Sequence, residues 1–157
     1  MKKSMVIYYS QTGTTGKIAN AVSEKFASEV ITIEPREPYG GYMLSIIRAG
    51  RELLTNDYIE VTTLIADLEG VDVVFVGFPI WYGDMPKFVK DYLAKCKLGD
   101  RVVVPFATSG SSGIDRAVKT LRKIAPQARI RRPFVSKAKS KGDMARWLGE
   151  IEKQMDM

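Results

Sequence analysis

Histidine is absent from this 157-residue chain, and cysteine occurs once. Without histidine there can be no Ser-His-Asp triad, no Cys-His dyad and no imidazole acid–base chemistry. A single cysteine excludes an internal disulfide framework, and without histidine it also excludes the usual ligand sets of zinc sites and iron–sulfur clusters. No metal site is therefore expected, and demanding chemistry in this chain would need a borrowed cofactor.

Long apolar runs are also lacking. None approaches the roughly 20 residues that cross a bilayer. Residues 5–9 form an apolar stretch after two lysines, but the stretch is too short for the core of a signal peptide. The sequence therefore indicates a cytoplasmic protein with no membrane partner. The length suits one domain over residues 1–157.

Short apolar, β-branched runs alternate with segments of helical periodicity. The expected strands cover residues 5–9, 30–33, 71–78, 102–106 and, more weakly, 130–135. The first, third and fourth are almost continuously apolar, as in parallel strands that are buried on both faces. A repeating strand–helix order predicts an α/β domain whose parallel sheet has right-handed crossovers and helices on both faces.

Apolar residues at helical spacing predict five helices. Their apolar faces run from Ile18 to Phe26, Met43 to Leu54, Phe88 to Cys96, Ile114 to Ile124 and Met144 to Met155. Asp84 is expected to cap the third helix, with Pro86 in its first turn. Cys96 falls on the apolar side of that helix and is expected to act as a small buried hydrophobe.

A hydroxyl-rich loop joins the first expected strand to the first helix. It consists of Ser10, Gln11, Thr12, Gly13, Thr14 and Thr15. Ligands of doubly wound sheets bind at the carboxyl ends of the strands, and the free amides and dipole of a helix start favour an anion. The nucleotide P-loop and the G-x-G-x-x-G dinucleotide fingerprint are both absent. The loop suits a single phosphate monoester, and an ordinary capped helix start is the alternative.

Two more loops follow the third and fourth expected strands. They consist of Pro79, Ile80, Trp81, Tyr82 and Gly83, and of Ala107, Thr108, Ser109, Gly110, Ser111, Ser112 and Gly113. In order and spacing, the three loops resemble the [ST]-x-T-G-x-T phosphate loop, the P-I-W-[WY]-G loop and the third flavin-contacting loop of flavodoxins. This resemblance covers nearly the whole chain.

The resemblance implies a three-layer flavodoxin-like fold with a five-stranded parallel sheet in the order 2-1-3-4-5. It also implies noncovalent FMN at the three loops, with the phosphate held by the hydroxyls and amides of Ser10, Thr12, Thr14 and Thr15. Trp81 and Tyr82 would give the flat ring a platform, and Gly83 would let the backbone approach flavin N5. Amides of residues 108–113 would meet the O2, N3 and O4 atoms of the ring, and Ser111 or Ser112 is also expected to cap the next helix. The sequence leaves open which of the two aromatic residues stacks on the ring.

The third loop departs from the family pattern. Many flavodoxins sandwich the flavin with a second aromatic residue from this loop, and residues 107–113 contain none. One face of the ring would therefore be open, or covered by another segment or subunit. Open access would suit hydride transfer to a small substrate as well as single-electron transfer.

Charge is the second departure, because familiar flavodoxins are acidic and this chain has a net charge of +6. Residues 115–146 hold eleven Lys and Arg against two Asp, a net +9, and residues 1–114 are near neutral. This basic block is either a solvated face or a dock for acidic redox partner proteins or an anionic substrate. Nucleic acid is disfavoured because residues 116–132 contain no aromatic residue. The block is expected to lie largely outside the flavin loops.

The sequence therefore predicts an FMN-binding, flavodoxin-like electron-transfer protein whose redox chemistry belongs to the flavin and which has no catalytic residue of its own. One alternative is an NAD(P)H-dependent FMN or quinone oxidoreductase that uses the open ring face. A further alternative is a flavin-free basic interaction module.

Overall fold

A parallel sheet forms the centre of the computed structural model, which describes residues 2–37, 47–51, 60–138 and 142–155. The strands are β1 (Ser4–Tyr8), β2 (Glu29–Thr32), β3 (Val73–Pro79), β4 (Val102–Ser109), β5 (Arg129–Ile130) and β6 (Phe134–Lys137). Their order is β2-β1-β3-β4-β5, with β6 also paired to β4. The predicted order 2-1-3-4-5 is confirmed. The nearly continuous apolar runs are the buried strands β1, β3 and β4.

Two short strands occupy the fifth position of the sheet, instead of the one strand expected over residues 130–135. β5 pairs with the first residues of β4, and β6 pairs with its last four. Between them the N–H of Arg131 still donates to the carbonyl of Val103 at 3.0 Å, but Pro133 has no N–H to donate. The ladder is interrupted there. β6 then resumes the pairing as far as Lys137, at the carboxyl end of β4.

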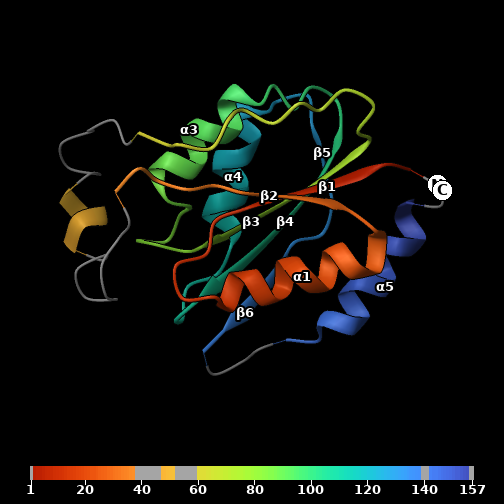
Figure 1. Cartoon of the computed structure of the whole chain (residues 1–157). Helices are drawn as coiled ribbons and strands as arrows, with labels where there is room; N and C mark the ends of the chain where they lie inside the picture. The colour runs from red at the N-terminus through yellow and green to blue at the C-terminus, as the bar shows by residue number, and fades with distance from the viewer. Residues whose placement is uncertain (1, 38–46, 52–59, 139–141, 156–157) are drawn as a thin grey trace.

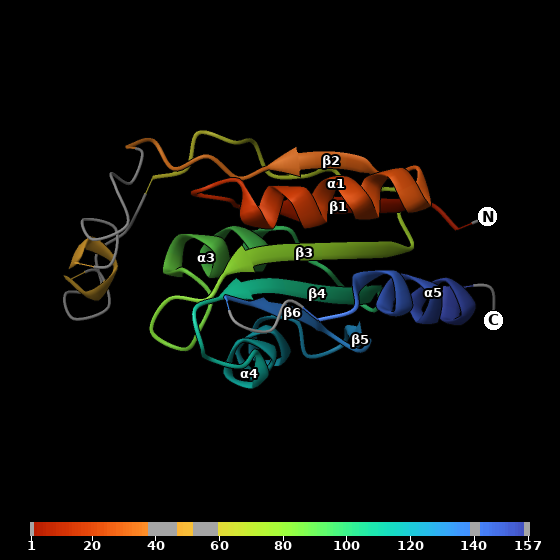
Figure 2. The ribbon, with the colours of Figure 1, turned by 90° about the horizontal axis from the view of Figure 1, so that it is seen from below.

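Helices cover both faces of the sheet (Figure 1). α1 (Thr14–Phe26) and α5 (Met144–Met155) pack on one face, and α3 (Lys87–Lys95) and α4 (Asp115–Ile124) pack on the other. This is the expected three-layer α/β arrangement. In Figure 2 the strands run side by side toward one end of the molecule, and the chain termini lie at the other end. None of the described helices has the length and apolar character needed to cross a bilayer.

Two helix expectations need correction. α3 begins after Pro86, which occupies the N-cap position instead of the first turn. Asp84 does not cap this helix; its carboxylate accepts a hydrogen bond from the amide of Met85 at 2.7 Å. Of the helix expected from Met43 to Leu54, residues 47–51 are helical, and the rest of that expectation lies outside the described residues.

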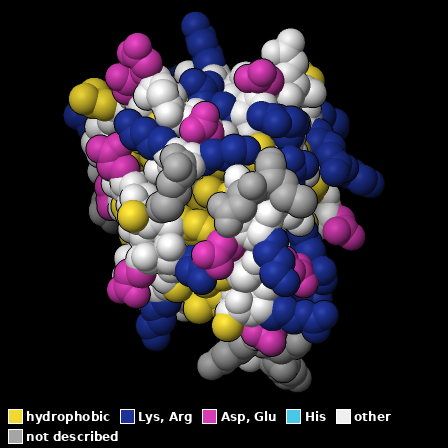
Figure 3. All heavy atoms as spheres, turned by 90° about the vertical axis from the view of Figure 1, so that its right-hand side faces the viewer, with side chains coloured by type: hydrophobic (Ala, Val, Ile, Leu, Met, Phe, Trp, Pro, Cys, Tyr) yellow, Lys and Arg dark blue, Asp and Glu magenta, His cyan; other side chains and the backbone are white. Residues whose placement is uncertain are grey.

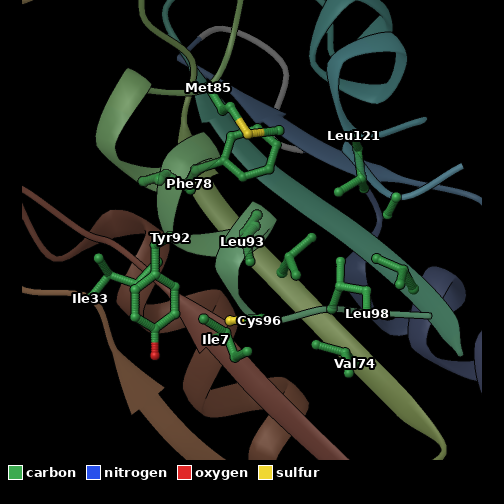
Figure 4. Close-up of a cluster of buried hydrophobic side chains, with 14 of the residues drawn as sticks. Ile7, Ile33, Val74, Phe78, Met85, Tyr92, Leu93, Cys96, Leu98 and Leu121 are labelled. Carbon is green, nitrogen blue, oxygen red and sulfur yellow. The ribbon is translucent and has the colours of Figure 1, made fainter. Parts of the chain in front are cut away.

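Apolar side chains form one buried cluster on each face of the sheet. The cluster under α3 and α4 includes Ile7, Phe78 and Leu121, and Figure 4 shows Cys96 among these side chains. Cys96 is 6% exposed, so the expectation of a small buried hydrophobe is confirmed. Burial raises the pKa of its thiol to about 11. The cluster under α1 and α5 is built around residues such as Trp147.

Basic side chains gather at the end of the molecule where the strands begin. Figure 3 faces this end and shows many Lys and Arg side chains with scattered acidic ones. Arg129, from the basic block, is fixed here by donating to the carbonyl of Asp100 at 2.9 Å. Arg101 beside it donates to the carbonyls of Val71 and Leu68, each at 2.9 Å. Part of the positive charge therefore lies far from the carboxyl ends of the strands.

Candidate functional site

A cavity of about 500 Å³ opens at the carboxyl ends of the central strands. This volume is within the roughly 300–1,000 Å³ that is usual for sites of small organic ligands. The described residues that line it come from four segments: Gln11, Thr12, Thr14 and Thr15; Pro79, Ile80, Trp81 and Tyr82; Thr108, Ser109, Gly110, Ser111 and Ser112; and Ser136, Lys137 and Ala138. Each segment ends or follows a strand, because parallel strands deliver their carboxyl ends to one edge of the sheet.

The loop between β1 and α1 is closed by its own serine. The Ser10 hydroxyl oxygen accepts hydrogen bonds from the amides of Gly13 at 3.1 Å and Gly16 at 3.2 Å. Gly13 is the N-cap of α1 and has φ 89°, a conformation that favours glycine. Ser10, predicted to hold the phosphate, therefore shapes the loop from inside and does not line the cavity.

The start of α1 presents unpaired donors to the cavity. The N-cap residue Gly13 has no side chain to cap the helix, and among the described amides the Ser10 hydroxyl accepts hydrogen bonds only from those of Gly13 and Gly16. Within the described residues, the amides of Thr14 and Thr15 have no hydrogen-bond acceptor, as expected for the first turn of a helix. The hydroxyls of Thr12 and Thr14 lie 3.4 Å apart beside these amides. Amides, hydroxyls and the helix dipole together form a site for an anion.

A hydrogen bond joins the first loop to the third. The hydroxyls of Thr15 and Thr108 are 2.8 Å apart, and Thr15 is only 2% exposed. The amide of Ile80 donates to the carbonyl of Thr108 at 2.8 Å, which ties the second loop to the same residue. The three loops are therefore held together by direct contacts around Thr108.

Residues 81–84 form a tight hairpin turn. The amide of Trp81 donates to the carbonyl of Asp84 at 2.8 Å, and the amide of Asp84 donates back at 3.1 Å. The two central residues, Tyr82 and Gly83, have φ values of 52° and 80°. This pair of positive φ angles is typical of a type I′ turn, in which a tyrosine is unusual. The Asp84 carboxylate also accepts from the Thr120 hydroxyl of α4 at 2.7 Å, which anchors the turn.

Trp81 and Tyr82 have different environments. Trp81 packs edge-on against Tyr9 and Phe88, with ring centroids 5.8 and 6.5 Å away. Tyr82 is 49% exposed. A Cβ atom on Gly50 would lie 2.7 Å from the Tyr82 hydroxyl, so the Tyr82 ring reaches the helical residues 47–51 and glycine makes room for it. Trp81 is thus a fixed wall of the cavity, and Tyr82 a more accessible one.

The third loop leads into α4 without a side-chain cap. Ile114 is the N-cap residue, and no side-chain hydrogen bond caps the helix. The expectation that Ser111 or Ser112 caps it is therefore wrong. Both serines are exposed and line the cavity.

The sequence profile of flavodoxins matches residues 3–151. The chain belongs to the flavodoxin family. No curated protein sequence matches it. Solved structures of proteins described as flavoproteins, from Bacteroides uniformis and Bacteroides eggerthii, are 26% and 27% identical to this chain, each with a TM-score of 0.82. The matches cover 96% and 97% of this chain and 98% and 99% of those chains. A flavoprotein from Lactobacillus acidophilus, solved in complex with FMN, is 22% identical with a TM-score of 0.74, over 86% of this chain and 93% of that one.

In this member of the flavodoxin family, thirteen of the eighteen predicted site residues line the cavity. The other five are Ser10, Gly13, Gly83, Ala107 and Gly113. The wall made by residues 136–138 was not predicted from the sequence. The expected strand order could have predicted this wall. The fifth strand of a flavodoxin sheet neighbours the fourth, so its carboxyl end must approach the third loop.

The basic block also contributes to the site more than expected. Lys137 lines the cavity, and Arg116 donates to the carbonyl of Tyr82 at 3.4 Å. Neither residue belongs to the three flavin loops, and the block lies largely outside these loops as expected, but these two side chains reach the site from α4 and β6.

Proposed function

We propose that this flavodoxin-family chain binds FMN noncovalently and works in electron transfer. The observation that carries the proposal is the single cavity that combines three kinds of surface: an anion site at the start of α1, two aromatic side chains after β3, and a backbone-rich loop after β4. These are the three parts of FMN recognition, namely phosphate, flat ring and pyrimidine edge. The FMN complex of the Lactobacillus acidophilus flavoprotein supports the same ligand.

The phosphate would bind at the start of α1. The unpaired amides of Thr14 and Thr15 and the hydroxyls of Thr12 and Thr14 are donors to its oxygens. Charge-assisted hydrogen bonds of this kind contribute about 1.5–3 kcal/mol each. No basic residue of the loop is required, because the amides and the helix dipole already supply positive partial charge.

The ring would pack against Trp81, whose orientation is fixed by Tyr9 and Phe88. Tyr82 would cover the outer part of the same wall. Residues 108–112 would meet the polar edge of the ring through their main chain. FMN, when bound, supplies reversible transfer of one or two electrons, and the protein binds it, orients it and excludes water from part of its surface.

Comparing two flavins tests this assignment. Riboflavin has the ring without the phosphate, so replacing both hydroxyls in Thr12→Val/Thr14→Val should weaken FMN binding at least tenfold and change riboflavin binding little. Quenching of flavin fluorescence in a titration measures both affinities. Thr62→Val is a matched control, because Thr62 is an exposed threonine outside the cavity. Purified protein that stays colourless and does not bind added FMN would refute the proposal and favour the flavin-free interaction module.

An NAD(P)H-dependent FMN or quinone oxidoreductase is the second candidate. It is favoured by the third loop, which carries no aromatic residue, so the described lining has aromatic side chains only at Trp81 and Tyr82. A ring stacked on one side leaves its other side for a small substrate. Steady oxidation of NADH or NADPH with a quinone acceptor would favour this enzyme. Two well-separated one-electron reduction potentials of the bound flavin, without steady oxidation of NADH or NADPH, would favour the electron carrier.

We also propose that the redox partner is an acidic protein that docks beside α4. Four basic residues of α4 are exposed: Arg116, Lys119, Arg122 and Lys123. None of them forms an ion pair within the described part of the chain. α4 adjoins the turn that walls the cavity, through the contact of Thr120 with Asp84. A partner attracted to this helix would arrive close to the cavity.

Charge reversal on α4 tests the docking surface. Lys119→Glu/Arg122→Glu should slow electron transfer with an acidic redox protein at least tenfold at low ionic strength, and added salt should remove the difference. Lys2→Glu/Lys3→Glu makes the same change in net charge at the other end of the molecule and should have a much smaller effect. Equal slowing by both pairs would show that only net charge matters and would refute this docking surface.

A further inference from the structure

We propose that Lys137 gives the flavin site a positive charge that holds FMN more tightly in its reduced form than in its oxidised form. This inference rests on the proposed FMN binding. Lys137 is the last residue of β6 and lines the cavity, although it belongs to none of the three loops that resemble flavodoxin loops. It therefore adds a charged group on a fourth side of the site.

The main chain on both sides of Lys137 is fixed. In the β4–β6 ladder, Lys137 is the partner of Ser109, the residue at which β4 ends. The next amide, that of Ala138, donates to the carbonyl of Ser109 at 3.0 Å. The lysine is consequently held beside the third loop, whose amides are expected to meet the polar edge of the ring. Across the interruption at Pro133 the pairing with β4 shifts by one residue, because Ile130 pairs with Val103 and Phe134 pairs with Phe106.

No acidic side chain in the described lining of the cavity neutralises the positive charge of Lys137. Among the described residues that line the cavity there is no Asp or Glu, and Lys137 is the one basic residue. Within the described residues it forms no ion pair and no side-chain hydrogen bond. Its side chain is partly buried, which limits screening by water. An anionic group in the cavity would therefore interact with this charge directly.

Reduction changes the charge of the ring. When FMN takes up two electrons and one proton, the ring gains one negative charge, and the phosphate keeps its own. A cation beside the ring therefore stabilises the reduced form more than the oxidised form. At an effective dielectric constant near 20, attraction between unit charges about 10 Å apart changes an equilibrium on the order of tenfold. A cation that acted on the phosphate alone would favour both forms equally.

The test measures the affinities of oxidised and of dithionite-reduced FMN for the unchanged protein and three variants. Lys137→Gln should reduce the preference for reduced FMN roughly tenfold, which lowers the two-electron potential by about 30 mV. Lys137→Arg keeps the charge and should keep most of the preference. Lys153→Gln is the matched control, because Lys153 is an exposed lysine of α5 outside the cavity, and it should change neither affinity.

Two results would overturn the role of Lys137. One is that Lys137→Gln loses affinity equally for oxidised and reduced FMN but binds riboflavin as tightly as the unchanged protein does. This result would show that the lysine acts on the phosphate. The other is an unchanged ratio of the two affinities in Lys137→Gln. Failure of the unchanged protein to bind FMN at all would instead refute the proposed function and this inference with it. The measurement therefore distinguishes the two failures.

Discussion

Tyr82 provides a test of how the second loop is built, because its backbone has a conformation that residues with a side chain rarely adopt. Its φ of 52° lies in the left-handed region, and the turn is closed by hydrogen bonds between Trp81 and Asp84. A residue with a Cβ atom is strained there, and glycine is not. We therefore expect Tyr82→Gly to be more stable than Tyr82→Ala, although alanine is more stabilising than glycine inside a helix or strand.

The expected difference follows from two opposing terms. The left-handed conformation costs a residue with a Cβ atom about 1–2 kcal/mol. Glycine loses more backbone entropy on folding, which costs roughly 0.5–1 kcal/mol. Both variants lose the same packing of the half-exposed Tyr82 ring, so that contribution cancels in the comparison. The free energy of unfolding should therefore be about 0.5–1 kcal/mol higher for Tyr82→Gly.

Urea unfolding of the FMN-free protein measures this difference. With a slope near 2 kcal/mol per M, the midpoints should differ by roughly 0.3–0.5 M. Lys119→Ala and Lys119→Gly form the control pair, because Lys119 is exposed in the middle of α4, where glycine costs about 1 kcal/mol relative to alanine. Glycine should thus be more stabilising than alanine at position 82 and less stabilising than alanine at position 119. If Tyr82→Ala were as stable as Tyr82→Gly, the turn would not impose the left-handed conformation and the strain argument would be wrong.

Three further predictions concern the scaffold. Gly77→Ala should lower the free energy of unfolding by about 1–3 kcal/mol in urea, because its Cβ would collide with the buried ring of Phe106. Arg101→Met should cost about 1–3 kcal/mol by the same assay, since its guanidinium donates to four carbonyls, and Arg101→Lys should restore part of the loss. Stability should fall as pH rises above about 9, because burial raises the pKa of Cys96 from 9.0 to about 11 and that of Tyr92 from 10.0 to about 12, so the folded chain keeps protons that the unfolded chain loses. Unfolding at pH 8 and 10.5 measures this loss, which should be smaller in Tyr92→Phe.

The sequence predicts the architecture and three walls of the cavity for one physical reason. Buried parallel strands read as continuous apolar runs, and the crossovers between them have one handedness. Once the strand order is set, the residues after β1, β3 and β4 must meet at one edge of the sheet. Loops as far apart in sequence as Thr15 and Thr108 are therefore in contact, with hydroxyls 2.8 Å apart.

The features that were missed depend on long-range pairing. The fourth wall requires the register of β6 on β4, which the interruption at Pro133 hides in the sequence. The positive φ of Tyr82 depends on a turn anchored from α4, where Thr120 donates to Asp84. Asp84 has the residue type and position of a helix cap, and the distant hydroxyl uses its carboxylate instead. Local sequence patterns cannot indicate such contacts.

The two departures from the family pattern meet at the same place in the fold. The β3 side of the cavity carries its described aromatic residues, Trp81 and Tyr82, and the β4–β6 side carries hydroxyls, glycine and Lys137. A flavin between two aromatic walls would hold a reduced, negative ring in an apolar environment, which is costly. Here the missing aromatic residue of the third loop leaves a polar wall with a cation beside it. The formal charge in the described lining of this site therefore depends on where one lysine of the basic block lies, and the net charge of +6 is a poor guide to it.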